Sequence, residues 1–310
     1  MKNAILFILA VMIWGSTWLV ITYQLGTVHP LVSVAYRFAI ASIILLGYCY
    51  WKKLFQPLPL KTHGFLTLQG ICLFGLNYWA VYTGEHYITS ALAAVLSTVI
   101  IYFNILFGWL LLNKSISKEV VMGALVGIGG VVLLFMPELT QSELSNETVA
   151  ATTWLGIFLV LGGSVLASLG NITSAYTQSI KVAVTHANAL SMSYATVFLF
   201  VMILVLDIPI TFETTPVYIA SLFYLAIFGS VIAFWAYLTL VGNIGADKAG
   251  YAVLVYPAIA LILSSWFENY QWQWQSFAGL AFIVVGNLIA MNKWRHVNTL
   301  LRIANTRIRG

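Results

Sequence analysis

The chain has 310 residues, of which 61% are apolar and 7% charged, and its formal net charge is +5. Soluble domains contain about 45–50% apolar and about 25% charged residues, so this composition excludes a water-soluble globular protein. A helix needs about 20 mostly apolar residues to cross a bilayer core that is about 30 Å thick. The apolar runs are continuous, which also excludes a membrane β-barrel, because its strands alternate apolar and polar residues.

Ten apolar stretches follow one another along the chain, and each is expected to cross the membrane once as a helix. The first is interrupted by the polar group Trp14-Gly15-Ser16-Thr17 and is followed by no small-residue cleavage site, so we expect a retained helix and not a signal peptide. The predicted spans are residues 4–24, 31–51, 65–84, 88–112, 119–136, 154–178, 187–206, 216–240, 246–267 and 273–291.

Positive and negative residues lie in different sets of loops between these stretches. The positive-inside rule therefore predicts a multi-pass protein of the cell (inner) membrane with both termini in the cytoplasm. The cations at span ends and in the loops of one side are Lys2, Lys52, Lys53, Lys61, Lys114, Lys118, Lys181, Lys248, Lys293, Arg295, Arg302, Arg307 and Arg309. The opposite loops contain no Lys or Arg and carry Glu85, Glu138, Glu143, Glu147, Asp207, Glu213 and Glu268.

A polar loop divides the chain near its midpoint, and the two halves resemble each other. A shift of about 155 residues brings Gly15-Ser16 onto Gly170-Asn171 and Phe74-Gly75 close to Phe228-Gly229. Because each half has an odd number of helices, the second half must enter the membrane from the other face. The predicted domains are a five-helix repeat at 1–136, an extracytoplasmic loop at 137–153, a second repeat at 154–291 and a basic cytoplasmic tail at 292–310.

The excess positive charge lies mostly in the tail, so it requires no nucleic-acid partner. Two interpretations of the tail stay open, a short helix on anionic lipid or a frayed segment that sets topology. Cys49 and Cys72 have the spacing of neither a disulfide framework nor a zinc site. We therefore expect no metal and no cofactor. The expected partners are the lipid bilayer and a small-molecule substrate, and a homo-oligomer is compatible with the sequence.

Several short motifs give the chain a family resemblance over nearly its whole length. They are Trp14-Gly15-Ser16, Arg37-Phe38, Thr89-Ser90-Ala91, Gly123, Gly130, Pro257, Glu268 and Gly279. With these motifs the chain resembles EamA-type members of the drug/metabolite transporter superfamily. The resemblance implies an all-α integral membrane fold of ten transmembrane helices in two inverted five-helix repeats. It also implies a central cavity lined mainly by the first, third, fourth, sixth, eighth and ninth helices, and export or exchange of small metabolites. Tyr102 stands where a proline is usual, which argues against a proline-linked bend in the fourth helix.

Arg37 is the one Lys or Arg that lies within a predicted span and away from its ends, and it is our first candidate for substrate binding. A charged residue in a membrane is by default a functional hypothesis, and a guanidinium matches a carboxylate or a phosphate. A structural role is the alternative, in which Arg37 caps carbonyl groups or pairs with Glu85 at the same end.

The other candidates are polar and aromatic residues within apolar helices, which are expected to turn away from lipid. Helix packing is the alternative role for each of them. Together with Arg37, the candidate substrate-binding residues are Trp14, Ser16, Asn77, Tyr78, Tyr82, Tyr102, Asn104, Asn171, Tyr176, Trp235, Tyr237, Tyr251 and Tyr256.

No catalytic group or phosphate-binding loop is recognisable, so we expect no enzyme. The predicted function is secondary transport of small organic metabolites such as amino acids by alternating access, as an exporter or an exchanger. A carrier of phosphorylated or nucleotide-linked sugars is the alternative, followed by a channel. The acidic residues near the spans lie at their ends, at Glu85, Glu119, Asp247 and Glu268. We therefore expect facilitated transport or exchange, or coupling through a residue at the rim.

The charge pattern gives a direct test of topology. Reporter fusions or cysteine labelling should place the loop Pro137–Thr153 outside the cell and Lys114 inside, because the chain crosses the membrane once between them. If both loops were found on the same side, the two halves could not be inverted.

Overall fold

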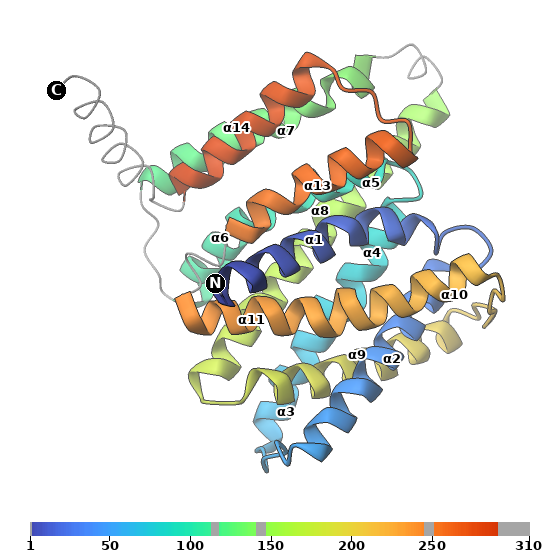
Figure 1. The fold of residues 1–310 in the computed structure, drawn as a ribbon, viewed down its shortest axis with the longest axis vertical. Helices are drawn as coiled ribbons and strands as arrows, with labels where there is room; N and C mark the ends of the chain where they lie inside the picture. The colour runs from blue at the N-terminus through green and yellow to red at the C-terminus, as the bar shows by residue number, and fades with distance from the viewer. Residues whose placement is uncertain (1, 113–117, 141–146, 245–250, 291–310) are drawn as a thin grey trace. The chain divides into compact units, whose positions relative to one another are not determined.

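The computed structural model describes residues 2–112, 118–140, 147–244 and 251–290, and all regular structure in these ranges is helical (Figure 1). Two of the elements, η1 and η3, are π-helical segments. The elements are α1 Lys2–Thr22, α2 Pro30–Trp51, α3 Leu60–Gln69, η1 Gly70–Leu76, α4 Asn77–Gly84, α5 Ser90–Ser97, α6 Ile100–Leu112, α7 Lys118–Thr140, α8 Glu147–Ser179, α9 Val184–Val205, α10 Pro216–Phe223, η3 Tyr224–Ile232, α11 Ala233–Ile244, α13 Tyr251–Phe267 and α14 Trp274–Ala290.

Each of the ten predicted stretches is helical over most of its described residues. Within the described ranges, seven helical segments are long and apolar enough to cross a membrane. They correspond to the first four predicted spans and to the sixth, seventh and eighth. Val255–Phe267 and Trp274–Ile289 are shorter apolar helices at the ninth and tenth predicted spans, and α7 covers the fifth.

Two helices begin with the same device, a polar cap followed by proline. His29 precedes Pro30 and its Nδ1 accepts the Leu31 N–H at 3.2 Å. Burial lowers the pKa of His29, which favours the neutral imidazole that an accepting Nδ1 requires. Thr215 precedes Pro216 and accepts from the Tyr218 N–H. Proline suits a first helical position because it has no N–H that would need a partner.

The two π segments occupy equivalent places in the two halves of the sequence. η1 begins at Gly70 and η3 at Tyr224, which is the spacing at which the halves align. The Asn77 N–H donates to the Cys72 carbonyl, and the Ala233 N–H donates to the Phe228 carbonyl, so both helices contain bonds to the fifth preceding residue. Such segments are rare and occur frequently at functional sites.

The fourth predicted span is interrupted without a proline. α5 ends at Ser97 and α6 begins at Ile100, and the N–H of Thr98 and of Val99 each donate to the third preceding carbonyl. The hydroxyl groups of Ser97 and Thr98 donate to the carbonyls of Ala94 and Val95. Hydroxyl groups compete with the helical backbone in this way and often bend it.

The structure divides into two compact units, which we describe separately. The first contains residues 1–100 and 146–271. Its core forms where α2 packs on α9 and η1, around Phe38, Phe74, Tyr82 and Leu199, all fully buried. Gly70 allows the closest approach, since a Cβ there would overlap the Ser191 carbonyl oxygen.

The second unit contains residues 101–145 and 272–310, and its main contact is between α7 and α14, which lie side by side in Figure 1. Glycines from both helices make this contact. A Cβ on Gly130 would lie 2.7 Å from the Gly279 carbonyl oxygen, and a Cβ on Gly286 would lie 2.5 Å from that of Gly123. Small residues let helix backbones pack closely where no hydrophobic effect drives them together.

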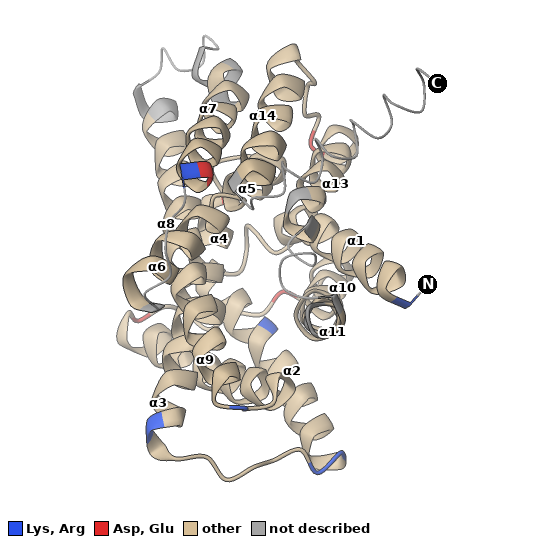
Figure 2. Cartoon of the chain, turned by 90° about the vertical axis from the view of Figure 1, so that its left-hand side faces the viewer, with Lys and Arg blue, Asp and Glu red and all other residues tan. Residues whose placement is uncertain are grey.

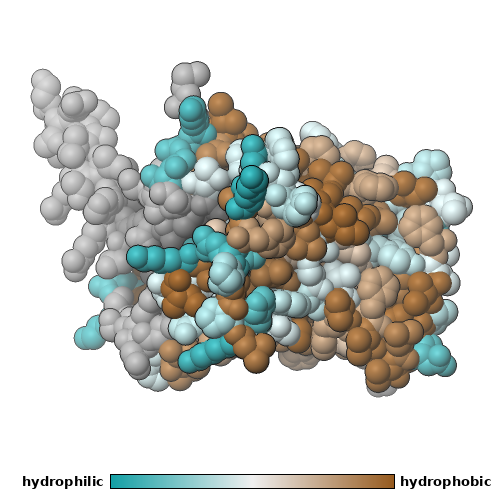
Figure 3. Space-filling model, turned by 90° about the horizontal axis from the view of Figure 1, so that it is seen from below, coloured by the Kyte–Doolittle hydropathy of each residue, from teal (hydrophilic) through white to brown (hydrophobic). Residues whose placement is uncertain are grey.

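The surface fits a lipid environment. Large apolar side chains are exposed along the helices, including Ile43, Phe158 and Leu204. Figure 3 shows hydrophobic residues spread broadly over one face, and Figure 2 shows how few Lys, Arg, Asp and Glu the helices carry. Exposed apolar area on this scale is unusual for soluble monomers. The protein is therefore a multi-pass membrane protein.

The Gly70 contact gives a stability test. Gly70→Ala should lower the free energy of unfolding by about 1–3 kcal/mol, because the methyl group overlaps the Ser191 backbone and forces η1 and α9 apart. Thermal unfolding of purified protein in detergent measures the loss. Gly64→Ala is the matched control, since a Cβ at Gly64 meets nothing within 4 Å. Equal melting temperatures of the two variants would contradict the close packing.

Candidate functional site

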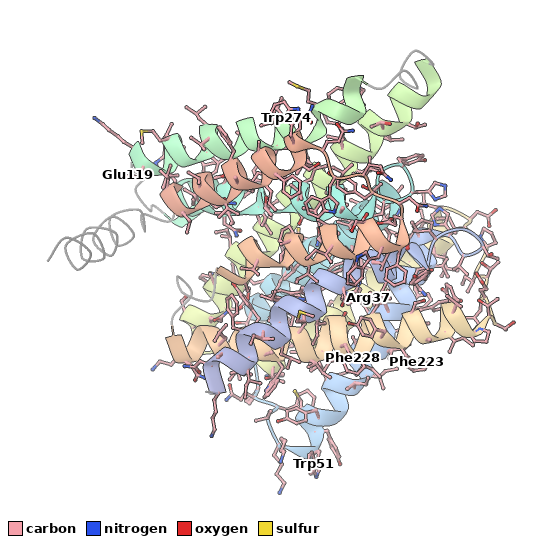
Figure 4. All side chains as sticks on the ribbon, turned by 45° about the horizontal axis from the view of Figure 1, so that its top comes forward. Arg37, Trp51, Glu119, Phe223, Phe228 and Trp274 are labelled. Atoms are coloured by element: carbon pink, nitrogen blue, oxygen red, sulfur yellow. The ribbon has the colours of Figure 1, made fainter. Side chains whose placement is uncertain are left out.

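Arg37 lies inside the first unit and is only 1% exposed. Figure 4 shows it between the helices, whereas Trp51 lies at the end of α2. Its Nε donates to the Ser230 hydroxyl at 3.0 Å, and its Nη1 donates to the Tyr82 hydroxyl at 3.2 Å. These partners come from η3 and α4, so the guanidinium connects three segments that are distant in sequence.

The faces of the guanidinium are covered by aromatic rings. Its carbon atom lies 4.5 Å from the Tyr78 ring centroid and 5.5 Å from that of Phe38. Gly229 leaves space on another side, since a Cβ there would lie 3.1 Å from Arg37 Nη2 and 2.9 Å from Thr17 Cγ2. A cation over an aromatic ring gains about 0.5–2 kcal/mol, the larger values applying away from water.

The hydrogen-bond partners of the Arg37 guanidinium within the described ranges are neutral. Among the described residues, no carboxylate lies within 4.0 Å of its nitrogen atoms. Its bonds go to hydroxyl groups and not to backbone carbonyls, and Glu85 is not an ion-pair partner. Burying a charge costs several kcal/mol unless an opposite charge compensates it. The site is therefore suited to a bound anion.

A second group of aromatic side chains lies on α1, η3, α11 and α13. The Trp14 ring lies 5.4 Å from that of Phe234 and 5.0 Å from that of Tyr237. The Trp18 ring stacks on that of Tyr256 at 6.1 Å. The Tyr256 hydroxyl shares a hydrogen bond with Ser97 at 2.6 Å, and the Tyr224 hydroxyl shares one with Ser16 at 2.6 Å.

Half of the predicted site residues lie in or beside two groups of contacting side chains in the first unit. Arg37, with Tyr78 and Tyr82, forms one group, and Trp14 with Tyr237 forms another. The predicted residues in or beside these two groups are Trp14, Ser16, Arg37, Tyr78, Tyr82, Tyr237 and Tyr256.

The other predicted residues have different surroundings. Asn77 donates to the Leu73 carbonyl of its own helix, and the Tyr176 ring lies against that of Phe65. Trp235 is 52% exposed. Tyr102, in the second unit, donates to the Gly123 carbonyl at 3.2 Å, which is a contact between helices. Asn104 and Asn171 are half-buried, and the side chain of Tyr251 lies outside the described residues.

Sequence reasoning missed several residues that surround the candidates. They are Trp18, Ser97, Tyr224, Gly229, Ser230 and Phe234. A signal existed for two of them, because Gly229 belongs to the dipeptide that aligned between the halves and Ser230 follows it directly.

Comparison with known proteins gives the class. The model of the EamA-like transporter family matches residues 1–136 and 154–292. The uncharacterized inner membrane transporter YedA of Escherichia coli K12 is 28% identical over 291 residues, covering 91% of this chain and 88% of that protein. An uncharacterized transporter of Buchnera aphidicola is 26% identical over 112 residues, covering 36% of this chain and 37% of its own length.

One solved crystal structure superimposes with a TM-score of 0.64 at 19% identity, covering 93% of this chain and 96% of that one. At this identity the likeness concerns the fold alone. The helical membrane fold and the two family matches define a transporter. The chain belongs to the EamA-like transporter family.

The bonds to Arg37 can be tested by a double-mutant cycle. Ser230→Ala and Tyr82→Phe should each lower the free energy of unfolding by about 1.5–3 kcal/mol, because each removes a bond to a buried charge. The double variant should depart from the sum by more than about 0.5 kcal/mol, since both residues bind one guanidinium. Denaturant titration in mixed micelles measures all three values.

The matched controls are Ser179→Ala and Tyr50→Phe, at exposed positions. They should change stability little and should add. Strict additivity of Ser230→Ala and Tyr82→Phe, with costs no larger than those of the controls, would show that neither hydroxyl stabilises Arg37.

Proposed function

We propose that this protein is a secondary transporter that exports or exchanges small organic metabolites with a carboxylate, such as amino acids, by alternating access. It acts in the cell (inner) membrane with both termini in the cytoplasm. The observation that carries the proposal is Arg37, a buried cation with neutral partners on η3 and α4. A guanidinium held in this way offers a carboxylate a charge-assisted contact that no described residue already occupies.

The aromatic side chains support a substrate with an organic body. Trp14 and Tyr237 belong to one group of rings, and Tyr78 lies directly against the guanidinium. A ring contact adds about 0.5–1.5 kcal/mol beyond area burial, which gives preference and not strict selection. Such a site favours a range of related metabolites over a single compound.

The number of cations favours a carboxylate over a phosphate. Arg37 is the one Lys or Arg among the buried residues of the described chain. A phosphate ester carries up to two negative charges, and its sites usually combine several cations or backbone N–H groups. A phosphorylated or nucleotide-linked sugar is therefore the second candidate.

Alternating access is supported by the similarity of the two halves. The family model matches the chain twice, once on each side of residues 137–153. The π segments also recur at the spacing of the repeat. η3 contains Ser230, which binds Arg37, and η1 leads into α4, which carries Tyr78 and Tyr82. Two similar halves with inverted topology can exchange conformations, which exposes a central site first to one side and then to the other.

Counterflow in proteoliposomes tests the substrate class. Arg37→Gln should weaken exchange of carboxylate-containing amino acids at least tenfold more than exchange of the corresponding amines, because only the carboxylate loses its ion pair. Lys52→Gln is the matched control, since it removes one exposed positive charge. If all substrates weaken equally while the protein stays folded, Arg37 is structural, and the carboxylate assignment is wrong.

A further inference from the structure

Glu85 is a buried acid whose carboxyl oxygens have no hydrogen-bond partner in the part of the chain that the structure describes. It caps the C-terminal end of α4 and is 6% exposed. Neither oxygen accepts or donates a hydrogen bond to any described group. An ionised carboxylate in such a place would lose its hydration without compensation, whereas a protonated carboxyl loses much less. The geometry alone therefore favours the neutral acid.

The electrostatic surroundings of Glu85 also favour its neutral form. A helix C-terminus carries partial negative charge from its unpaired carbonyls, which disfavours an anion at this end of α4. Burial and the nearby negative charge of Glu268 raise the pKa of Glu85 well above its ordinary value, and the charge of Arg37 lowers it. Burial is the largest of these influences, so their net effect raises the pKa of Glu85 and favours its protonated form.

Contacts between helices hold the segment that follows Glu85 in place. The backbone N–H of Ser90 donates to Glu268 Oε1 at 3.3 Å, and the Ser90 hydroxyl donates to Oε2. These bonds connect the start of α5 to the end of α13. Ser90 is fully buried, and the neighbouring Thr89 hydroxyl is buried without a partner. The half-buried carboxylate of Glu268 thus lies close enough to the buried carboxyl group of Glu85 to act on it electrostatically.

We propose that Glu85 is a proton-binding site whose protonation holds this end of the transporter closed. One proton from water converts the Glu85 carboxylate into a carboxylic acid in the closed arrangement. When the Ser90–Glu268 contact opens and water enters, the acid returns the proton to water. The proposal rests on the proposed transport function and makes Glu85 the rim residue through which pH acts on it.

The groups that can influence this equilibrium are few. The elements packed against α4 are α8, η1 and α2. Arg37 on α2 is the charged residue directed toward α4, through Tyr82. Between residues 151 and 179, α8 has no acidic, basic or histidine residue, and neither has η1. Among the side chains that the structure describes, Glu268 beyond α13, the adjacent His86 and Tyr82 of α4 complete the set, and the side chain of Glu147 lies outside them.

The sign of the pH effect follows from the two environments of Glu85. Its affinity for a proton is higher when it is buried than when it is hydrated, so protonation favours the closed arrangement. The closed arrangement is therefore favoured at low pH and lost as pH rises through the raised pKa of the buried acid. Between the two pKa values, the ratio of open to closed molecules should increase about tenfold per pH unit.

Infrared spectroscopy of the purified protein in lipid, in choline chloride at neutral pH, tests protonation without any substrate. The wild type should show the carbonyl stretch of a buried carboxylic acid, and Glu85→Gln should lose it. Glu85→Asp should retain an acid band, which distinguishes loss of the acid from misfolding. Glu268→Gln should shift the titration of the band to lower pH, because it removes the nearby negative charge.

Opening is measured by the reaction of Thr89→Cys with a membrane-impermeant maleimide. This labelling rate is divided by the labelling rate of Thr214→Cys, an exposed position. The division corrects for the increase in thiol ionisation as pH rises. The ratio should rise with pH in the wild-type background and should stay low and constant with Glu85→Gln.

An acid band that survives Glu85→Gln, or a labelling ratio that does not depend on pH, would overturn the proposal. Loss of the band when sodium chloride replaces choline chloride at constant pH would also overturn it and would assign the site to sodium. Failure of amino-acid counterflow in the wild type would contradict the transport function and leave these two measurements unaffected.

Discussion

The structure of the first unit depends on the placement of one positive charge in a region that water does not reach. In a membrane protein the burial of such a charge is costly, and a buried charged side chain is stable only when polar groups contact it. Here Ser230 and Tyr82 supply two hydroxyl groups, and Tyr78 supplies a ring face. Each comes from a segment that must hold its position for Arg37 to remain buried. The packing of α2, α4 and η3 therefore depends on their contacts with Arg37.

The π segments explain how these groups reach Arg37. In η3 the Ser230 hydroxyl donates to the Leu225 carbonyl, the fifth preceding residue, and its oxygen accepts from Arg37. The same segment contains Gly229, which leaves room for the guanidinium. η1 leads directly into α4, which carries Tyr78 and Tyr82. A helix that is widened for one turn has weaker local geometry, so these positions are reasonable places for the movement that alternating access requires.

The sequence predicted the helices and the position of Arg37 within one of them well, and it predicted less well which side chains face the interior. Hydropathy identifies helices because lipid leaves the backbone no other partner, and a lone charge in an apolar stretch is conspicuous. Trp235 and Tyr237 illustrate the limit. Both are aromatic residues on α11, yet Trp235 is exposed while Tyr237 lies against Trp14. The preceding π segment adds a residue to a helical turn and rotates everything after it, so helical periodicity alone cannot assign the inner face. Tyr102 shows that a membrane tyrosine can also bind a neighbouring helix.

Arg37 and Glu85 are linked by electrostatics even though they form no ion pair. The charge of Arg37 is the influence that lowers the pKa of Glu85. A substrate carboxylate bound at Arg37 would neutralise that charge, and the proton affinity of Glu85 would rise. By linkage, protonation of Glu85 would strengthen binding of the carboxylate by the same factor. Since protonation favours closure at the Glu85 end, an occupied site would promote its own closure on that side. Coupling of this kind needs no mechanical path between the two residues, because the field of one charge acts directly on the other.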